Sequence, residues 1–258
     1  MQIIYDDKNF VVLHKDAYIC SAPLKSIEEE KNCALAFAIE KFPEIKEVQN
    51  SLKQNEFGLV HRIDTETEGL LLIAKNTQTW NFFRKIQSEN LFKKEYLAFC
   101  NKNADLSEGF PICPFQLKKD QIITSKFRHY GPKGSQVRPV LLDSDNTFSS
   151  KKASDKIYST KILNFEKLSE KSENEIFKIQ CAITQGFRHQ VRCHLAWLGF
   201  PVIADKVYGT KCKNESDIES QMQFYATALE FPEPNFDGSS SSKILRFDCS
   251  SQIKRAAD

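Results

Sequence analysis

The stretch His61-Arg62-Ile63-Asp64-Thr65-Glu66-Thr67-Glu68-Gly69 runs directly into the apolar run Leu70-Leu71-Leu72-Ile73-Ala74. The continuous apolar run predicts a buried β-strand over residues 70–74. A carboxylate beside an arginine stays ionised, because the opposite charge favours its charged form. An ionised carboxylate is what a carboxylate nucleophile requires, so Asp64 is a candidate for one. The same residues also fit a polar turn before a core strand, and composition alone leaves both interpretations open.

Two further segments share a family pattern with the first. One is Gly186-Phe187-Arg188-His189-Gln190-Val191-Arg192-Cys193-His194-Leu195, followed by Gly199-Phe200-Pro201-Val202-Ile203-Ala204-Asp205-Lys206-Val207-Tyr208-Gly209. The other is Lys94-Glu95-Tyr96-Leu97-Ala98. Together with the stretch around Asp64, they resemble the motifs of the RluA-type pseudouridine synthases, in the family's order. The resemblance runs from about Ile3 to Phe231.

The resemblance implies an isomerase that converts specific uridines of ribosomal or transfer RNA into pseudouridine. It implies that Asp64 is the catalytic residue, that Tyr96 packs on the uracil base, and that Arg192 pairs with the aspartate and orients it. The residues for which we expect substrate contacts in this region are His61, Arg62, Thr67, Arg188, His189 and Gln190. Each also has an ordinary structural interpretation: a core tyrosine, a hydrogen-bonded histidine, surface ion pairs for the arginines.

The elements read from the sequence predict an α/β fold of the α+β kind, with mixed, mainly antiparallel sheets. Expected strands cover residues 3–5, 10–14, 70–74, 94–100, 157–165, 175–184, 223–231 and 243–249. Helices are expected at 34–42 behind a capping box of Ser26 and Glu29, from a cap at Thr77, and over 188–198 with Gly199 after its end. The resemblance adds two subdomains around a central active-site cleft. We expect a single catalytic domain over 1–258, without the family's amino-terminal RNA-binding domain.

Composition places few further constraints on function. Of the 258 residues, 41% are hydrophobic and 27% charged, and the net charge is only +2, so any affinity for RNA has to come from local clusters. The eight cysteines form no Cys-x-x-Cys pair, so we expect reduced thiols and no metal or other cofactor. The amino terminus does not read as a signal peptide, and no apolar run is long enough to span a bilayer. A cytoplasmic protein that acts as a monomer, with structured RNA as its partner and no membrane contact, is the expectation.

Residues from about 105 to 157 form a basic, loop-rich excursion punctuated by proline and glycine. Its basic residues are Lys118, Lys119, Lys126, Arg128, Lys133 and Arg138, interleaved with Phe115, Phe127, His129 and Tyr130. Basic groups follow phosphates and aromatic faces stack on bases, so the segment is a candidate RNA-binding surface. A solvated loop with incidental lysines is the alternative.

The chain departs from the family pattern at Glu68, where a serine is usual, and at Phe187, where an arginine is usual. A glutamate facing Asp64 would raise the pKa of that carboxyl and repel phosphate, whereas one facing outward would do neither. Two other function classes therefore stay open. One is a non-catalytic RNA-binding protein on the same fold, and the other is a carboxylate-dependent hydrolase, which would need Glu66 or Glu68 as its second carboxylate.

Overall fold

The computed structural model describes residues 1–23, 32–103, 108–142, 153–168, 175–209, 221–236 and 243–253. The chain divides into two compact units. The first contains Met1–Lys94 and Tyr225–Ile253, and the second contains Glu95–Phe224. The predicted capping box of Ser26 and Glu29 lies outside the described residues.

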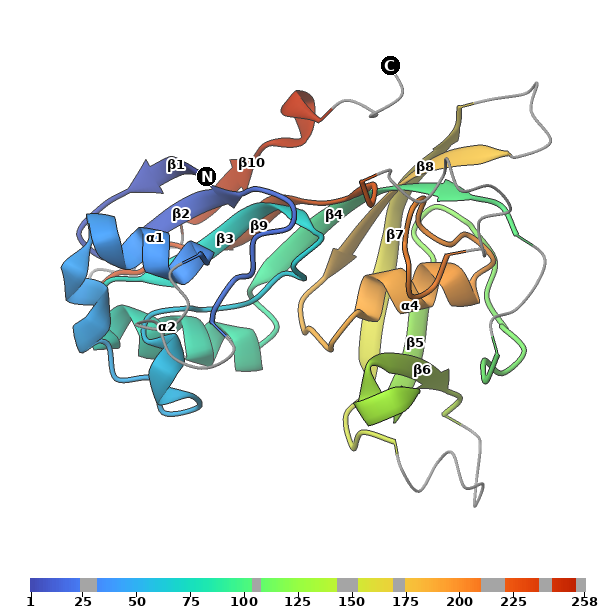
Figure 1. The fold of residues 1–258 in the computed structure, drawn as a ribbon, viewed down its shortest axis with the longest axis horizontal. Helices are drawn as coiled ribbons and strands as arrows, with labels where there is room; N and C mark the ends of the chain where they lie inside the picture. Colours follow the sequence, from blue (N-terminus) through green and yellow to red (C-terminus); the bar gives the residue numbers. More distant parts are fainter. Residues whose placement is uncertain are drawn as a thin grey trace. The chain divides into compact units, whose positions relative to one another are not determined.

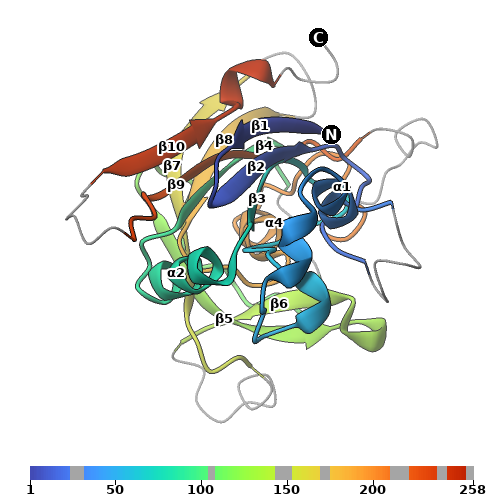
Figure 2. The ribbon, with the colours of Figure 1, turned by 90° about the vertical axis from the view of Figure 1, so that its left-hand side faces the viewer.

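The sheet of the first unit has the strand order β1-β2-β3-β9-β10. Its members are β1 (Gln2–Asp6), β2 (Phe10–Lys15), β3 (Glu68–Ala74), β9 (Phe224–Pro232) and β10 (Ile244–Asp248). β3 pairs with β9 in parallel, whereas the β1–β2, β2–β3 and β9–β10 pairs are antiparallel (Figure 2). The mixed sheet and the small number of helices confirm the α+β class expected from the sequence, and each of these strands lies where a strand was predicted.

Gly69 makes the parallel pairing of β3 and β9 possible. It lies opposite Ala226 and has a φ of +130°, a backbone conformation that L side chains rarely adopt. A Cβ atom built at this position would come within 2.1 Å of the Ala226 carbonyl oxygen. Only glycine therefore fits where the segment containing Asp64 enters the sheet.

Two helices, α1 (Ala34–Lys41) and α2 (Thr77–Ser88), accompany this sheet. Their buried residues include the predicted apolar stripes of Ala34, Leu35, Ala38 and Ile39, and of Trp80, Phe83 and Ile86. The expected cap at Thr77 is wrong by one residue. Asn76 caps α2, its side chain accepting from the Thr79 N–H at 2.8 Å, whereas the Thr77 hydroxyl accepts from the Gln49 N–H. Short 3₁₀ turns lie at Pro43–Glu47, Gln54–Glu56, Pro132–Gly134 and Ser250–Gln252.

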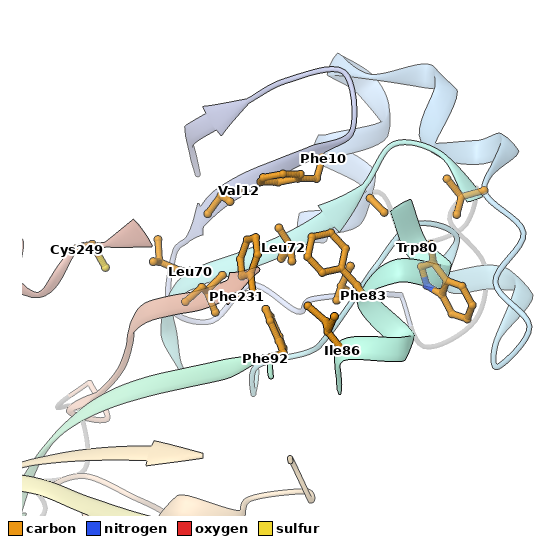
Figure 3. Packing of buried hydrophobic residues seen from close by; sticks show 14 residues of the cluster. Phe10, Val12, Leu70, Leu72, Trp80, Phe83, Ile86, Phe92, Phe231 and Cys249 are labelled. Carbon is orange, nitrogen blue, oxygen red and sulfur yellow. The ribbon is translucent and has the colours of Figure 1, made fainter. Parts of the chain in front are cut away.

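Aromatic rings form much of the core of the first unit (Figure 3). Phe83 of α2 and Phe231 of β9 meet edge to face, with centroids 5.1 Å apart, and Phe10 of β2 contacts both rings at 5.7 Å. Leu70 and Leu72 of β3 belong to the same cluster. Interlocked rings of this kind resist displacement, so β3 gives the preceding turn a rigid base.

The second unit contains a sheet of order β4-β8-β7-β5-β6, and α4 packs on β6 and β7 (Figure 1). Its elements are β4 (Lys93–Asn101), β5 (Ile122–Tyr130), β6 (Gln136–Val140), β7 (Tyr158–Lys167), β8 (Ile176–Ile183) and α4 (Gln190–Trp197). The predicted strands at 94–100, 157–165 and 175–184 are confirmed. No helix in the described ranges is long and apolar enough to cross a membrane.

Helix α4 begins later than predicted. His189 has a φ of +55°, in the left-handed region, so regular helix geometry starts only at Gln190 and Arg188 lies outside the helix. The predicted end is confirmed. Gly199 has a φ of +89° and donates to the Ala196 carbonyl, and Phe200 donates to the Leu195 carbonyl, which together form a Schellman motif.

The expectation of a loop-rich excursion at 105–157 is wrong for two parts of it. Residues 122–130 and 136–140 form the antiparallel strands β5 and β6. In β5 the side chains of Ile123, Ser125 and Phe127 are buried, and those between them are half-buried. That alternation is visible in the sequence, but the surrounding prolines and glycines obscure it.

Candidate active site

Asp64 lies in a turn whose backbone is held on both sides. The Thr67 N–H donates to the Asp64 carbonyl at 3.1 Å. The buried Ser21 hydroxyl donates to the Ile63 carbonyl at 2.8 Å and accepts from the Ile63 N–H at 3.1 Å. The half-buried Asp64 side chain therefore leaves from a backbone fixed at its neighbours, and it takes part in contacts of its own.

Lys15 is a basic residue that contacts this turn, and it lies outside the sequence motifs that contain Asp64, Tyr96 and Arg192. Its side chain is fully buried at the end of β2, and its ammonium donates to the carbonyls of Asp16, Ile19 and Thr65 at 3.0, 2.6 and 3.2 Å. Burial lowers the pKa of Lys15 to about 8, although the nearby Cys20 and Asp64 act in the opposite direction. The one signal in the sequence is a lysine at the end of a strand that begins with the four apolar residues 10–13.

His61 has the surroundings of a structural residue. It is 9% exposed, and its Nε2 accepts from the Leu72 N–H at 3.2 Å, which leaves the proton of the neutral ring on Nδ1. Burial, reinforced by the Lys94 ammonium, lowers the pKa of His61 to about 3. Of the two interpretations left open by the sequence, these contacts favour the structural one. Arg62, in contrast, is exposed and pairs with Glu56 at 3.1 Å.

Two other residues of this turn have contrasting surroundings. Thr67 is 1% exposed, and its hydroxyl has no hydrogen-bond partner among the residues described. Glu68, the departure from the family pattern, lies 3.5 Å from His14 Nε2 across the β2–β3 pair. This partner gives Glu68 a role apart from Asp64.

In the second unit, Arg192 of α4 forms a buried two-point ion pair with Asp205. Its Nε and Nη2 each donate to one carboxylate oxygen of Asp205 at 2.8 Å. Burial alone would raise the pKa of Asp205, but Arg192 and the N–H groups of Val207 and Tyr208 hold that pKa below its usual value. The geometry orients the guanidinium of Arg192, which has further contacts as well.

Tyr96 is 8% exposed on β4, and its ring stacks on Phe224 at 5.2 Å with an angle of 6° between the planes. Asp64 belongs to the first unit, and Tyr96 and Arg192 belong to the second. Each unit positions its own residues, and a single site formed by all three stays a prediction.

The polar residues around the start of α4 differ in their roles. Gln190 is 2% exposed, accepts from the Phe187 N–H at 2.9 Å, and donates to the Ser159 carbonyl at 2.9 Å. These bonds indicate a structural role. Arg188 is exposed and donates to the Gly134 carbonyl at 3.2 Å, so it does not share a helix face with Arg192 as the sequence suggested. His189 Nδ1 lies 3.2 Å from the Tyr208 hydroxyl.

The other histidine of this helix is also engaged by side chains. His194 contacts the Ser125 hydroxyl through Nε2 and the Thr160 hydroxyl through Nδ1, both at 2.9 Å, and burial lowers its pKa to about 3. The described residues hold no group of three or more His, Cys, Asp or Glu side chains suited to a metal ion, and their seven cysteines are free thiols.

The basic segment in 105–157 keeps part of its predicted surface. Lys118, Lys119 and Lys133 are exposed, and Lys126 and Arg128 are half-buried on β5. Arg138 does not belong to this surface: it is 4% exposed and lies over Tyr130 and Phe110, at 4.2 and 4.8 Å from the ring centroids.

The aromatic residues expected to stack on bases differ in burial: Phe127 is buried, Phe115 and Tyr130 are half-buried, and His129 is exposed. Phe127 is 1% exposed and stacks on Phe187 at 5.1 Å, and Phe115 meets Trp197 edge to face. This packing also explains the second departure from the family pattern, because Phe187 fills an aromatic cluster together with Tyr158. The prediction that Phe127 belongs to a base-stacking surface is wrong, since its ring is part of the core. For the half-buried Phe115 base stacking stays a prediction.

Comparisons with known proteins agree on one family. The ribosomal large subunit pseudouridine synthase C of Rickettsia typhi is 28% identical over 209 residues, which cover 81% of this chain and 56% of the relative. The ribosomal large subunit pseudouridine synthase D of Borreliella burgdorferi is 26% identical over 234 residues, covering 91% of this chain and 62% of the relative. The chain thus spans less than two thirds of the length of these relatives.

A solved structure and a family model complete the comparison. Human RNA pseudouridylate synthase domain containing 1 has a similar fold, with a TM-score of 0.64 over 96% of this chain and 82% of that chain, at 18% identity. The family model described as RNA pseudouridylate synthase matches residues 9–197, which include Asp64, Tyr96 and Arg192. On this match, the chain belongs to the RNA pseudouridylate synthase family.

Proposed function

We propose that the protein is an RNA pseudouridine synthase that isomerises uridines in ribosomal RNA or transfer RNA. The observation that carries this proposal is the turn around Asp64, which has the family's sequence and a backbone held by Ser21 and Lys15. The names of the relatives favour ribosomal RNA as the first substrate to test. The cytoplasmic location expected from the sequence would suit either RNA.

Pseudouridine formation breaks the bond between ribose and the uracil nitrogen, rotates the base, and joins it again through C5. A base stacked in RNA has to be flipped out before an enzyme can act on it. Asp64 would supply the ionised carboxylate at the sugar. Tyr96, supported on one ring face by Phe224, would pack on the base, and Arg192, oriented by Asp205, would pair with the aspartate.

Lys15 supports this role for Asp64 through charge and position. Its ammonium holds the carbonyl of Thr65, the residue directly after the aspartate, and its positive charge lies close enough to Asp64 to interact with it. The buried lysine therefore acts as a positioning residue, because it acts through the backbone and field of Asp64.

RNA contacts would come from the exposed and half-buried basic residues of the second unit: Lys118, Lys119, Lys126, Arg128 and Lys133. Arg62 and Arg188 are exposed and could add phosphate contacts. Glu68 pairs with His14 and Phe187 is part of an aromatic cluster, so neither departure argues for loss of turnover. The non-catalytic alternative therefore has no specific observation in its favour.

The decisive test maps pseudouridines in ribosomal and transfer RNA from cells with and without the gene. Loss of defined pseudouridines on deletion, restored by the wild-type gene, is the expected result. Asp64→Asn should restore none of them while the purified variant still binds RNA within severalfold of wild type, because affinity depends mainly on phosphate contacts.

Glu66→Gln is the matched control, since it removes a carboxylate two residues away, and it should restore the modification. Identical maps with and without the gene would overturn the proposed activity. Restoration by Asp64→Asn would instead remove Asp64 from its catalytic role.

A further inference from the structure

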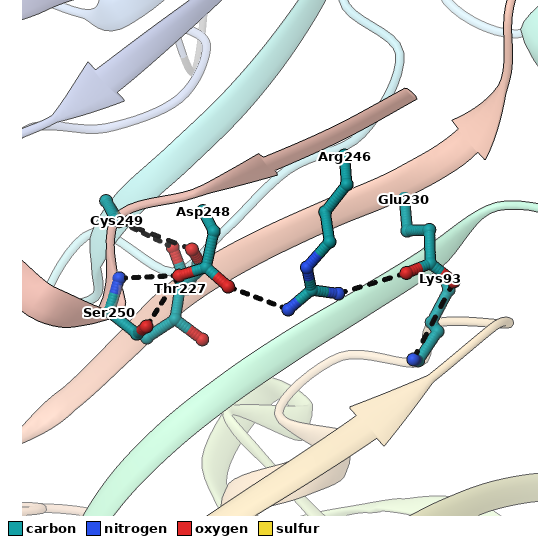
Figure 4. A network of polar contacts seen from close by, with 8 residues as sticks. Lys93, Thr227, Glu230, Arg246, Asp248, Cys249 and Ser250 are labelled. Carbon is teal, nitrogen blue, oxygen red and sulfur yellow. Dashed lines mark hydrogen bonds and ion pairs between the residues drawn. The ribbon is translucent and has the colours of Figure 1, made fainter. Parts of the chain in front are cut away.

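Lys94, at the start of β4, is a buried cation for which the described residues provide no anionic partner. It is 8% exposed, and within the described part of the chain its ammonium forms no hydrogen bond or ion pair. Its neighbour Lys93, in contrast, forms an ion pair. Lys93 Nζ lies 3.8 Å from the Glu230 carboxylate, which also pairs with Arg246 (Figure 4). Burying an unpaired ammonium is costly, so its retention at this position needs a reason.

The groups around Lys94 are basic or apolar. The Phe92 ring contacts both Lys94 and His61. Its centroid lies 5.7 Å from Lys94 Nζ and 5.5 Å from the His61 ring centroid. The half-buried Arg84 of α2 is close enough for its charge to add to the effect of burial, which lowers the pKa of Lys94 to about 8. Within the described residues, Lys94 therefore has one other positive charge, Arg84, and the neutral imidazole of His61 near it.

A hydrogen-bonded chain fixes the arrangement of these groups. Arg84 Nη1 donates to Gln87 Oε1 at 2.5 Å, and Gln87 Nε2 donates to the Val60 carbonyl at 3.1 Å. Val60 directly precedes His61, so these bonds join α2 to the segment that leads to Asp64. An arginine held by its neighbours and a lysine in a restricted space are pre-organised for one anionic group.

We propose that Lys94 and Arg84 form a binding site for a phosphate group of the substrate RNA. This inference rests on the proposed function, because it takes the anion to be a phosphodiester next to the target nucleotide. Lys94 and Tyr96 alternate with Glu95 along β4, so they lie on the same strand face, about 7 Å apart.

The test compares Lys94→Met and Arg84→Met with Lys93→Met, which removes a cation that already has a carboxylate partner. Binding of a short oligouridylate is measured over a range of salt concentrations. Each of the first two variants should bind roughly tenfold more weakly, the cost of one charged contact. Each should also lower the slope of log affinity against log salt by about 0.7, the value for one phosphate contact in a single strand.

The double variant separates one shared phosphate from two independent contacts. If Lys94 and Arg84 hold the same phosphate, Lys94→Met with Arg84→Met should lose clearly less affinity than the two single losses added together. Lys93→Met should stay within about twofold of wild type in affinity, because its charge is already compensated. Strict additivity would overturn the shared site.

A second readout keeps this inference separate from the proposed activity. Pseudouridine formation in transcribed large-subunit ribosomal RNA should keep its kcat and show a higher KM in Lys94→Met. A wild-type protein that forms pseudouridine, with a Lys94→Met variant of unchanged KM, oligouridylate affinity and salt slope, would overturn the phosphate site alone. A wild-type protein that neither binds RNA nor forms pseudouridine would overturn both.

Discussion

Lys15 and Asp64 are 49 positions apart in the sequence, yet the lysine holds the backbone directly after the aspartate through the Thr65 carbonyl. A fully buried ammonium that satisfies three carbonyls cannot be replaced by an apolar group without leaving those carbonyls unpaired. The backbone beside the candidate catalytic residue is therefore held in part by a side chain that is not part of the recognised motifs.

We expect Lys15→Met to lower kcat for pseudouridine formation by at least about tenfold, because small displacements of a reacting group cost one to two orders of magnitude. RNA affinity should change little, since the Lys15 side chain is 0% exposed and its ammonium already donates to three backbone carbonyls. Unfolding free energy should fall by about 1–3 kcal/mol from the unpaired carbonyls. Single-turnover kinetics and urea denaturation measure the two effects.

Lys8→Met removes a lysine from the β1–β2 turn and serves as the control for Lys15→Met. If Lys15→Met loses stability yet keeps the wild-type kcat, the lysine is structural only and has no positioning role.

Strand β5 has one face that packs in the core and another that carries half-exposed basic side chains. Phe127 and Ile123 are buried, whereas Lys126 and Arg128 lie between buried positions and are half-exposed. The adjoining turns carry the exposed Lys118, Lys119 and Lys133. The candidate RNA surface is therefore a strand with its flanking turns, and not a flexible loop.

Replacing Lys118, Lys119, Lys126, Arg128 and Lys133 together with glutamine should weaken RNA binding and flatten its salt dependence. Each lost phosphate contact lowers the slope of log affinity against log salt by roughly 0.7 to 0.9. The midpoint of urea denaturation should move little, because none of these side chains is part of the core. Filter binding over a salt series is the measurement.

Lysines already paired with carboxylates give the comparison set. Lys102 and Lys167 pair with Glu175, and Lys161 pairs with Asp120. Their replacement by glutamine should alter the salt slope much less. An equal loss of slope in both sets would mean that net charge, and not this surface, determines RNA binding.

The whole molecule has a pH dependence that follows from its buried lysines. Burial lowers the pKa of Lys94 to about 8 in the folded protein, whereas the unfolded chain keeps a value near 10.4. Between these two pH values the unfolded state binds more protons than the folded state. The free energy of unfolding therefore increases as pH rises from 8 to about 10.4, because the cost of the buried Lys94 charge is lost. Below pH 8 the folded protein carries the full cost of the buried charge.

Lys94→Met should therefore be more stable than wild type at pH 7, by about 2–3 kcal/mol. The difference should shrink as pH rises from 8 to about 10.5, because wild type loses its penalty while the variant has none. Urea denaturation at a series of pH values tests this. Trp80 and Trp197, the two tryptophans, lie in the first and second unit, so Trp197→Phe leaves a fluorescence signal from the unit of Lys94.

Lys93→Met, with its partly exposed lysine beside Glu230, should show no such trend. A stability difference for Lys94→Met that stays constant from pH 7 to 10.5 would mean that Lys94 is not the buried charge described here. Greater stability with weaker RNA binding would be the pattern expected of a residue kept for function.

Much of this protein could be predicted from its sequence because the relevant signals are local. The apolar run from Leu70 to Ala74 predicts β3, the periodic Trp80, Phe83 and Ile86 predict α2, and Gly199 marks the end of α4. These patterns depend on side-chain spacing within a few residues, which a single chain displays directly. The motif around Asp64 is local as well, so the candidate catalytic residue could be named before the fold was known.

The tertiary structure decided which polar residues are committed to the interior. Arg138 and Gln190 read as candidate RNA contacts, yet both are buried among partners. Nothing in the sequence analysis assigned a role to Lys15, and Lys94 entered it only as part of the motif that contains Tyr96. The left-handed His189 also removed Arg188 from the helix that its spacing predicted. Whether a polar side chain is buried, and which partner it finds there, depends on residues that are far apart in the chain. A local sequence pattern therefore does not show how the cost of desolvation is balanced by partner contacts.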